Sequence, residues 1–94
     1  MSMMEVQEES KNFSDTINWL ESEARGELIE MECDIDSDPE AKKRVAMLTA
    51  RIISESKDYL AWSISNATFD LKGIKLIKDN IVFWEEFQEK HLIA

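Results

Sequence analysis

The spacing of apolar residues in the first third of the chain is the feature that most constrains its fold. From Phe13 to Ile35 these residues follow one another at steps of 4, 3, 4, 4, 3 and 4 positions. Such steps place side chains on one face of an α-helix. Only two glycines and one proline occur, whereas turn-rich β architectures use more of both. The pattern predicts an all-α fold with a first helix over about residues 12–33, and with residues 1–11 frayed or separated from it by a cap at Ser14.

A proline after an acidic run marks the first interruption of the helical pattern. Asp38 is suited to cap a helix, and Pro39 is suited to its first turn, where no backbone N–H is needed. We therefore predict a second helix over about residues 39–66 that forms an antiparallel hairpin with the first. Its apolar residues cover a wide arc, which is typical of a central helix with neighbours on two sides.

A second interruption separates the hairpin from a third helix. Residues 66–70 carry polar side chains, and Thr68 or Asp70 can cap the helix that follows. The apolar residues beyond this point again recur at helical spacing, which predicts a third helix over about residues 71–90. The expected architecture is one domain over residues 1–94, a helical hairpin plus a C-terminal helix.

The second and third helices carry more apolar surface than one hairpin can cover. Large exposed apolar patches mark interfaces in soluble proteins. We therefore expect a homo-oligomeric helical bundle, with a monomeric three-helix bundle as the alternative. The residues predicted to make the contact between copies are Trp62, Ile64, Ile81, Trp84 and Phe87.

The chain is strongly acidic, with 20 acidic and 11 basic residues and a net charge of −9. Direct nucleic-acid binding and binding to an anionic membrane are disfavoured, because both depend on lysine and arginine. A protein partner with a basic surface suits this charge, and solubility alone is the other explanation. The residues predicted to bind such a partner are Glu21, Glu23, Glu27, Glu30 and Asp34.

This combination of acidic surface and spare apolar faces is typical of a protein–protein interaction module, such as an adaptor, an inhibitor or an assembly component. We take that as the first functional hypothesis. The dense acidic tract also permits a second one, an acidic DNA mimic that blocks a DNA-binding protein.

Most catalytic signatures are missing from the sequence. His91 is the single histidine, which argues against histidine-based metal sites and serine–histidine triads. Gly26 and Gly73 lie 47 residues apart, so no glycine-rich phosphate loop is present. Cys33 has no nearby histidine or basic cluster and is interpreted as a structural thiol. We therefore expect no cofactor and no catalytic residue in the first hypothesis.

Cellular location follows from the same composition. One cysteine cannot form an internal disulfide, and no apolar stretch approaches the roughly 20 residues that span a bilayer. The first residues are acidic and lack the apolar region of a secretory signal. These features favour a cytoplasmic protein, or one of the host cytoplasm if the source is viral.

Two carboxylate pairs support an enzymatic alternative. Glu27 and Glu30 are one helical turn apart, and Glu55 and Asp58 repeat the spacing on the second helix. This Glu-x-x-Glu and Glu-x-x-Asp pattern resembles that of the MazG-like all-α nucleoside triphosphate pyrophosphohydrolases. The resemblance implies that the four carboxylates bind Mg²⁺, which polarises a triphosphate and activates water, with Glu55 in the catalytic role. The sequence departs from the family where Gly26 precedes the first pair, since that position usually holds a second glutamate.

Overall fold

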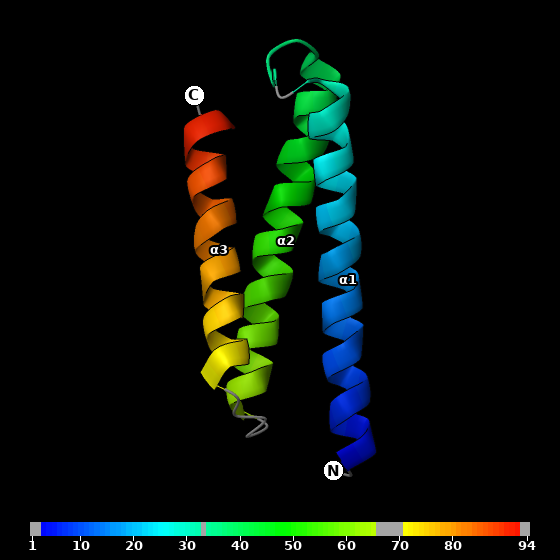
Figure 1. Ribbon diagram of the computed structural model, residues 1–94, viewed down its shortest axis with the longest axis vertical. Coiled ribbons are helices and arrows are strands. Elements are labelled where there is room, and N and C mark those ends of the chain that lie inside the picture. Colours follow the sequence, from blue (N-terminus) through cyan, green and yellow to red (C-terminus); the bar gives the residue numbers. More distant parts are fainter. Residues whose placement is uncertain (1–2, 33, 66–70, 93–94) are drawn as a thin grey trace.

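Three α-helices make up the computed structural model, which describes residues 3–32, 34–65 and 71–92 (Figure 1). In chain order the helices are α1 (Met3–Glu30), α2 (Pro39–Ser65) and α3 (Leu71–His91). No strand occurs among the described residues, and the helices pack against one another, so the prediction of an all-α fold is confirmed. The body is elongated, with extents of 48 × 20 × 17 Å.

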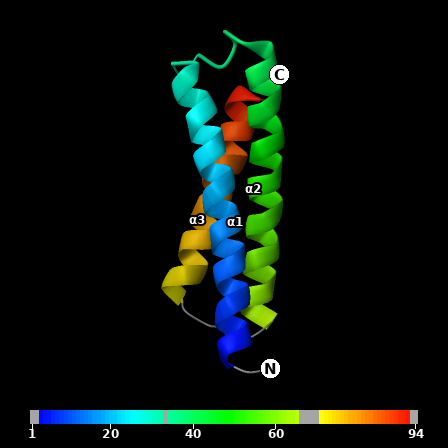
Figure 2. The same cartoon turned by 90° about the vertical axis from the view of Figure 1, so that its right-hand side faces the viewer.

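The second helix is the central element of the bundle. α1 and α2 run antiparallel, and α3 returns along α2, as the two views of Figures 1 and 2 show. Backbone contacts join α1 to α2 and α2 to α3. Within the part of the chain that the structure describes, no Cα atom of α1 comes within 8 Å of a Cα atom of α3. The wide apolar arc of α2 is therefore explained by neighbours on two sides.

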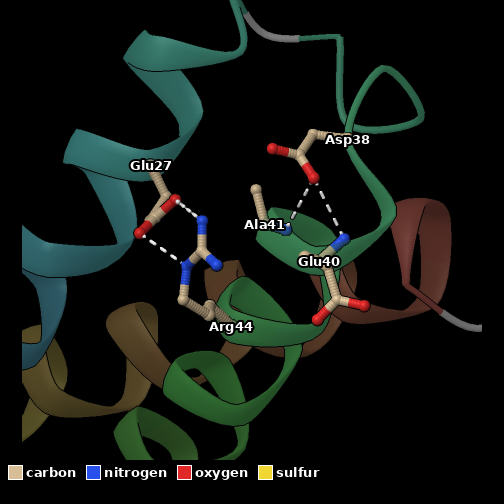
Figure 3. Close-up of polar contacts among 5 residues, drawn as sticks. All are labelled: Glu27, Asp38, Glu40, Ala41 and Arg44. Atoms are coloured by element: carbon tan, nitrogen blue, oxygen red, sulfur yellow. Dashed lines mark hydrogen bonds and ion pairs between the residues drawn. The ribbon is translucent and has the colours of Figure 1, made fainter.

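The turn between α1 and α2 follows the predicted capping chemistry. Asp38 Oδ1 accepts hydrogen bonds from the backbone N–H groups of Glu40 at 3.1 Å and Ala41 at 3.2 Å (Figure 3). Pro39 is the first residue of α2. At the other side of the turn, α1 ends at Glu30, somewhat before the predicted boundary, because Glu32 takes a left-handed backbone conformation with φ of 53°. Few residues other than glycine adopt it, and it stops a helix.

The beginning of α1 differs from the prediction. The helix starts at Met3 and continues through Ser14, so Ser14 is not a cap and residues 3–11 are helical. Side chains of α2 hold this segment in place. Ser10 Oγ and the Tyr59 hydroxyl share a hydrogen bond of 2.8 Å, and the ring of Phe13 stacks on that of Tyr59 at 5.2 Å. These tertiary contacts lie far apart in sequence, and local capping preferences do not reveal them.

Two groups of buried side chains form the core. The first fills the space among all three helices and consists of Leu20, Ala24, Ile52, Ile53 and Trp84. The second lies under the turn between α1 and α2 and consists of Met31, Ile35, Ala41 and Val45. Phe87 packs against both groups, so α3 joins them into one core.

Several predictions fall on residues outside the described ranges. They are the role of Cys33, the end of the second helix at residue 66, and the caps at Thr68 and Asp70. The third helix itself is present, from Leu71 to His91. None of the described helices is both long enough and apolar enough to cross a membrane.

Candidate functional site

The four carboxylates of the predicted metal site lie at two separate levels of the bundle. Glu27 faces Arg44, whose Nε and Nη2 donate hydrogen bonds of 2.9 and 3.1 Å to its two oxygens (Figure 3). Glu55 is 11 residues beyond Arg44 on α2, which corresponds to about 16 Å along a helix at ~1.5 Å per residue. Among the described residues, no three His, Cys, Asp or Glu side chains are grouped to hold a metal ion. The structure therefore does not bring Glu27 and Glu30 together with Glu55 and Asp58.

Glu55 lies in a shallow hollow between α1 and α2. The hollow has a volume of about 430 Å³ and also contains Glu9, Thr16 and Trp62. Glu55 is half-buried there, while Asp58 is exposed. Trp62 Nε1 donates a hydrogen bond of 2.6 Å to Glu9 Oε2. The residue proposed for catalysis in the enzymatic alternative thus has another carboxylate, a hydroxyl and an indole as its neighbours.

The five acidic residues predicted to bind a partner divide into two groups. Glu23, Glu30 and Asp34 are exposed. Glu21 and Glu27 are half-buried and bonded within the chain, Glu27 to Arg44 and Glu21 to residues of α3. The side-chain hydrogen bonds with Glu27, together with its charge, raise the pKa of the Arg44 guanidinium above its ordinary value. Three of the five residues are therefore presented to solvent.

The residues predicted to join copies of the chain occupy different environments. Ile81 is 7% exposed and Trp84 is 1% exposed, and Trp84 belongs to the core among the three helices. Trp62 and Phe87 are half-buried against neighbouring helices, whereas Ile64 is 54% exposed. Self-association remains a prediction, and in this conformation Ile81 and Trp84 are used within the single chain. Packing of α3 on α2 covers part of the apolar surface predicted from the sequence, whereas Leu71, Leu76, Val82 and Phe83 of α3 stay exposed.

One side of α1 points away from both other helices and carries an exposed aromatic ring. Trp19 is 56% exposed. Residues at the same helical angle surround it at steps of three, four or seven positions. We call this surface the outer face of α1, and it consists of Glu8, Asn12, Asp15, Trp19, Glu23, Gly26 and Glu30, all exposed.

Gly26 lies on this outer face and has no role in packing inside the molecule. A methyl group added at its Cα would meet nothing within 4 Å. Glycine in a helix interior is destabilising by about 1 kcal/mol relative to alanine. Packing against α2 or α3 therefore does not explain why a glycine occupies this position.

A second surface feature is a cleft between α1 and α3 with α2 as its floor. We call it the α1–α3 cleft, and its volume is about 580 Å³. In Figure 2 the first turns of α3, in yellow, stand away from α1. The lining residues are Ser10, Ser14, Ile17, Asn18 and Glu21 of α1, Ser56, Tyr59 and Ser63 of α2, and Gly73, Ile74, Leu76, Ile77 and Asn80 of α3.

Polar and aromatic side chains close the cleft at one end. Glu21 Oε1 accepts a hydrogen bond of 2.5 Å from Asn80 Nδ2 and one of 3.3 Å from Trp84 Nε1. Next to them, the guanidinium carbon of Arg25 lies 6.0 Å from the ring centroid of Phe83 and 5.7 Å from that of Trp84. These contacts connect α1 to α3 directly, so Glu21 serves inside the molecule as well as at the cleft.

Comparison of the chain with family models, with curated proteins and with solved structures finds no match. We therefore infer function from two surfaces of the molecule, the outer face of α1 and the α1–α3 cleft.

Both surfaces contain residues that the sequence interpretation did not single out. Trp19 lies between the apolar positions of its helix and not on them. The small residue Ser56 interrupts the apolar stripe of α2 between Ile52 and Tyr59. The positions of Trp19, outside the apolar stripe of α1, and of the small Ser56, within that of α2, are the sequence features that indicate these two surfaces.

Proposed function

We propose that this protein is an interaction module that binds a basic helical segment of another protein through the outer face of α1. The observation that supports this most is Trp19, which is 56% exposed on a surface that also holds four exposed carboxylates. Tryptophan is enriched among the few residues that dominate binding energy at protein interfaces. A large exposed ring without an intramolecular packing role is therefore suited to contact a partner.

The charge of the face defines the chemistry of the partner. Glu8, Asp15, Glu23 and Glu30 lie on the same face of α1 as Trp19, and all four carboxylates are exposed. The chain as a whole carries a net charge of −9. Complementary charge accelerates encounter and fixes orientation, and lysine or arginine side chains also bind favourably over a tryptophan ring. A partner rich in lysine or arginine suits both features.

The shape of the face favours a helix as the binding segment. Gly26 lies two turns beyond Trp19 on the same side of α1, and nothing occupies the space above it. Small residues let two helix backbones approach closely, while the neighbouring large side chain packs beside the contact. A helix that binds this face would bury surface against Trp19 and would approach the backbone of α1 closely at Gly26.

A direct test measures binding of a labelled amphipathic helical peptide built of lysine and leucine by fluorescence anisotropy. Binding should weaken strongly between about 50 and 500 mM salt, because ions screen the exposed charges. Trp19→Ala should weaken binding roughly tenfold or more, a loss of about 1.4 kcal/mol or greater. Met47→Ala is the matched control, because Met47 is an exposed apolar residue of α2. Equal effects of the two substitutions would contradict the proposal.

Paired charge reversals separate this face from net charge. Glu23→Lys with Glu30→Lys changes the outer face of α1, whereas Glu86→Lys with Glu89→Lys makes the same change in net charge at exposed positions of α3. We expect only the first pair to abolish binding. Gly26→Ala should stabilise the helix by about 1 kcal/mol and yet weaken binding. If both pairs weaken binding equally, attraction is non-specific and the face has no role.

A further inference from the structure

The floor of the α1–α3 cleft contains a buried hydroxyl that the protein itself does not use. Ser56 is 1% exposed, and its Oγ has no hydrogen-bond partner among the described residues. Buried polar groups in folded proteins are nearly always paired, and one left unpaired lowers stability. Because Ser56 lines the cleft, the group that would satisfy this hydroxyl is one that enters from outside.

The charge of the lining restricts what that group is. Glu21 is the only charged side chain among the described residues that line the cleft, and the remaining polar side chains are neutral serine, asparagine and tyrosine. Anionic ligands such as nucleoside triphosphates therefore find no basic partner here. A positively charged ligand finds a carboxylate inside the cleft, and the net charge of −9 favours its approach.

The apolar part of the lining indicates the rest of the ligand. Ile17 and Ile74 are buried, Ile77 is half-buried, and the three side chains come from α1 and α3. These side chains form an aliphatic surface between Glu21, at the closed end of the cleft, and the Ser56 hydroxyl on its floor. The volume of about 580 Å³ lies within the range of roughly 300–1,000 Å³ that is usual for small-molecule sites.

We propose that the α1–α3 cleft binds a small aliphatic amine, with its ammonium group at Glu21, its carbon chain against Ile17 and Ile77, and a second polar group at Ser56. Glu21 Oε1 already accepts hydrogen bonds from Asn80 and Trp84, which fix the carboxylate in position. A held carboxylate recognises an ammonium group without first having to be ordered. A second polar group on the ligand would supply the missing partner of Ser56.

This site is independent of the outer face of α1. Glu21 and Ser14 lie on the side of α1 that faces α3, whereas Trp19 and Glu23 lie on the side that faces solvent. Trp19→Ala should therefore leave amine binding unchanged, and Ser56→Ala should leave binding of the basic peptide unchanged. The two proposals can fail separately.

The test is titration of the ¹⁵N-labelled protein with pentane-1,5-diamine at constant ionic strength. We expect saturable shifts at Ser56, at the Asn80 side-chain amide and at the indole N–H of Trp84, because the last two groups donate to Glu21. Pentane-1,5-diol and pentanedioate have the same chain with neutral or anionic ends, and they should bind roughly tenfold more weakly or not at all. Equal binding of the diol, or shifts confined to the exposed acidic turn near Asp36, would overturn the proposal.

Substitutions inside the cleft, with a control outside it, test whether the diamine binds at this site. Glu21→Gln should weaken diamine binding by roughly tenfold, which is the size of effect expected when a charged hydrogen-bond partner becomes neutral. Glu86→Gln removes the same charge from an exposed position of α3 and should have no effect. Since Glu21 also connects α1 to α3, Ser14→Leu provides a second variant that narrows the cleft and keeps the carboxylate. Diamine binding that survives both changes would refute the site.

Lysine side chains carry the same ammonium chemistry as a free amine. Acetyl-lysine-amide and a short lysine peptide, titrated under the same conditions, show whether the cleft binds a free amine or a lysine side chain of a protein. The proposal requires the free diamine to bind at least as tightly as either lysine compound. Binding of the peptide alone would overturn it and show that the cleft accepts a protein segment.

Discussion

The same three helices are filled at one level of the bundle and hollow at another. At the level of Trp84, buried side chains such as Leu20 and Ile52 occupy the space that the helices share. Nearer the start of α3, Ser56 and Gly73 line the α1–α3 cleft. At the hollow level the first turns of α3 also stand away from α1 (Figure 2), so the two levels differ in the spacing of the helices as well as in the side chains between them.

This contrast shows that different turns of the same helices provide the stability and the binding surface. Close-packed apolar side chains contribute most of the stability of a small domain, and a 94-residue chain has little to spare. The filled level supplies that packing. The hollow level is therefore free to hold polar groups such as Ser56 and Asn80 that add little to the fold.

The largest effect is expected from shortening the two tryptophans of opposite burial. Trp84→Ala should lower the free energy of unfolding by about 3–5 kcal/mol, because it empties the filled level. Trp19→Ala should change it by no more than about 0.5 kcal/mol, since that side chain is 56% exposed. Urea denaturation followed by circular dichroism measures both. A similar loss in the two variants would break the comparison.

A smaller difference should separate two buried aliphatic residues of α1. Leu20 is 0% exposed in the filled level, whereas Ile17 is 7% exposed and lines the cleft. Leu20→Ala should cost about 2–5 kcal/mol, and Ile17→Ala about 1 kcal/mol less, because a gap that opens to water is not an empty cavity. The same urea titrations report the two values. Equal losses would show that the cleft is closed in solution.

The smallest effect concerns two buried hydroxyls of α2. Thr49 is 0% exposed and Ser56 is 1% exposed, and neither hydroxyl has a partner among the residues described. Thr49→Val should raise the midpoint of thermal unfolding, with a gain of about 1 kcal/mol, because an unpaired buried polar group is removed. Ser56→Ala should gain less, because valine replaces the lost hydroxyl of Thr49 with a methyl group, whereas alanine leaves a small gap at Ser56. Destabilisation in both variants would mean that both hydroxyls are bonded in solution.

Local features of the fold could be predicted from the sequence because they depend on residues close together in the chain. Helical periodicity gave the three helices, and the pair Asp38 and Pro39 gave the start of α2. The beginning of α1 was predicted wrongly, because residues 3–11 are held by contacts with Tyr59 and Trp62 on another helix. Capping rules describe a helix in isolation and contain no information about such contacts.

The candidate sites depended on how the helices align, which spacing alone does not determine. Glu27 and Glu55 match a known carboxylate pattern in sequence, but the antiparallel pairing places Arg44 opposite Glu27. Trp84 fits the helical pattern of α3, and only the packing of α3 on the other helices shows that it is buried within the single chain. The alignment of small residues around Ser56 likewise becomes a cleft only when three helices are brought together.

The central place of α2 has a consequence for partly unfolded states of the molecule. α1 and α3 share no backbone contact within the described residues, so detachment of either helix breaks its packing on α2 and the side-chain contacts of Glu21 with Asn80 and Trp84, while the other helix stays packed on α2. Partial opening of this kind needs less free energy than complete unfolding. Hydrogen exchange in the two outer helices is then governed by separate openings, and the amides of α2 exchange last, since they are exposed only after both neighbours have left.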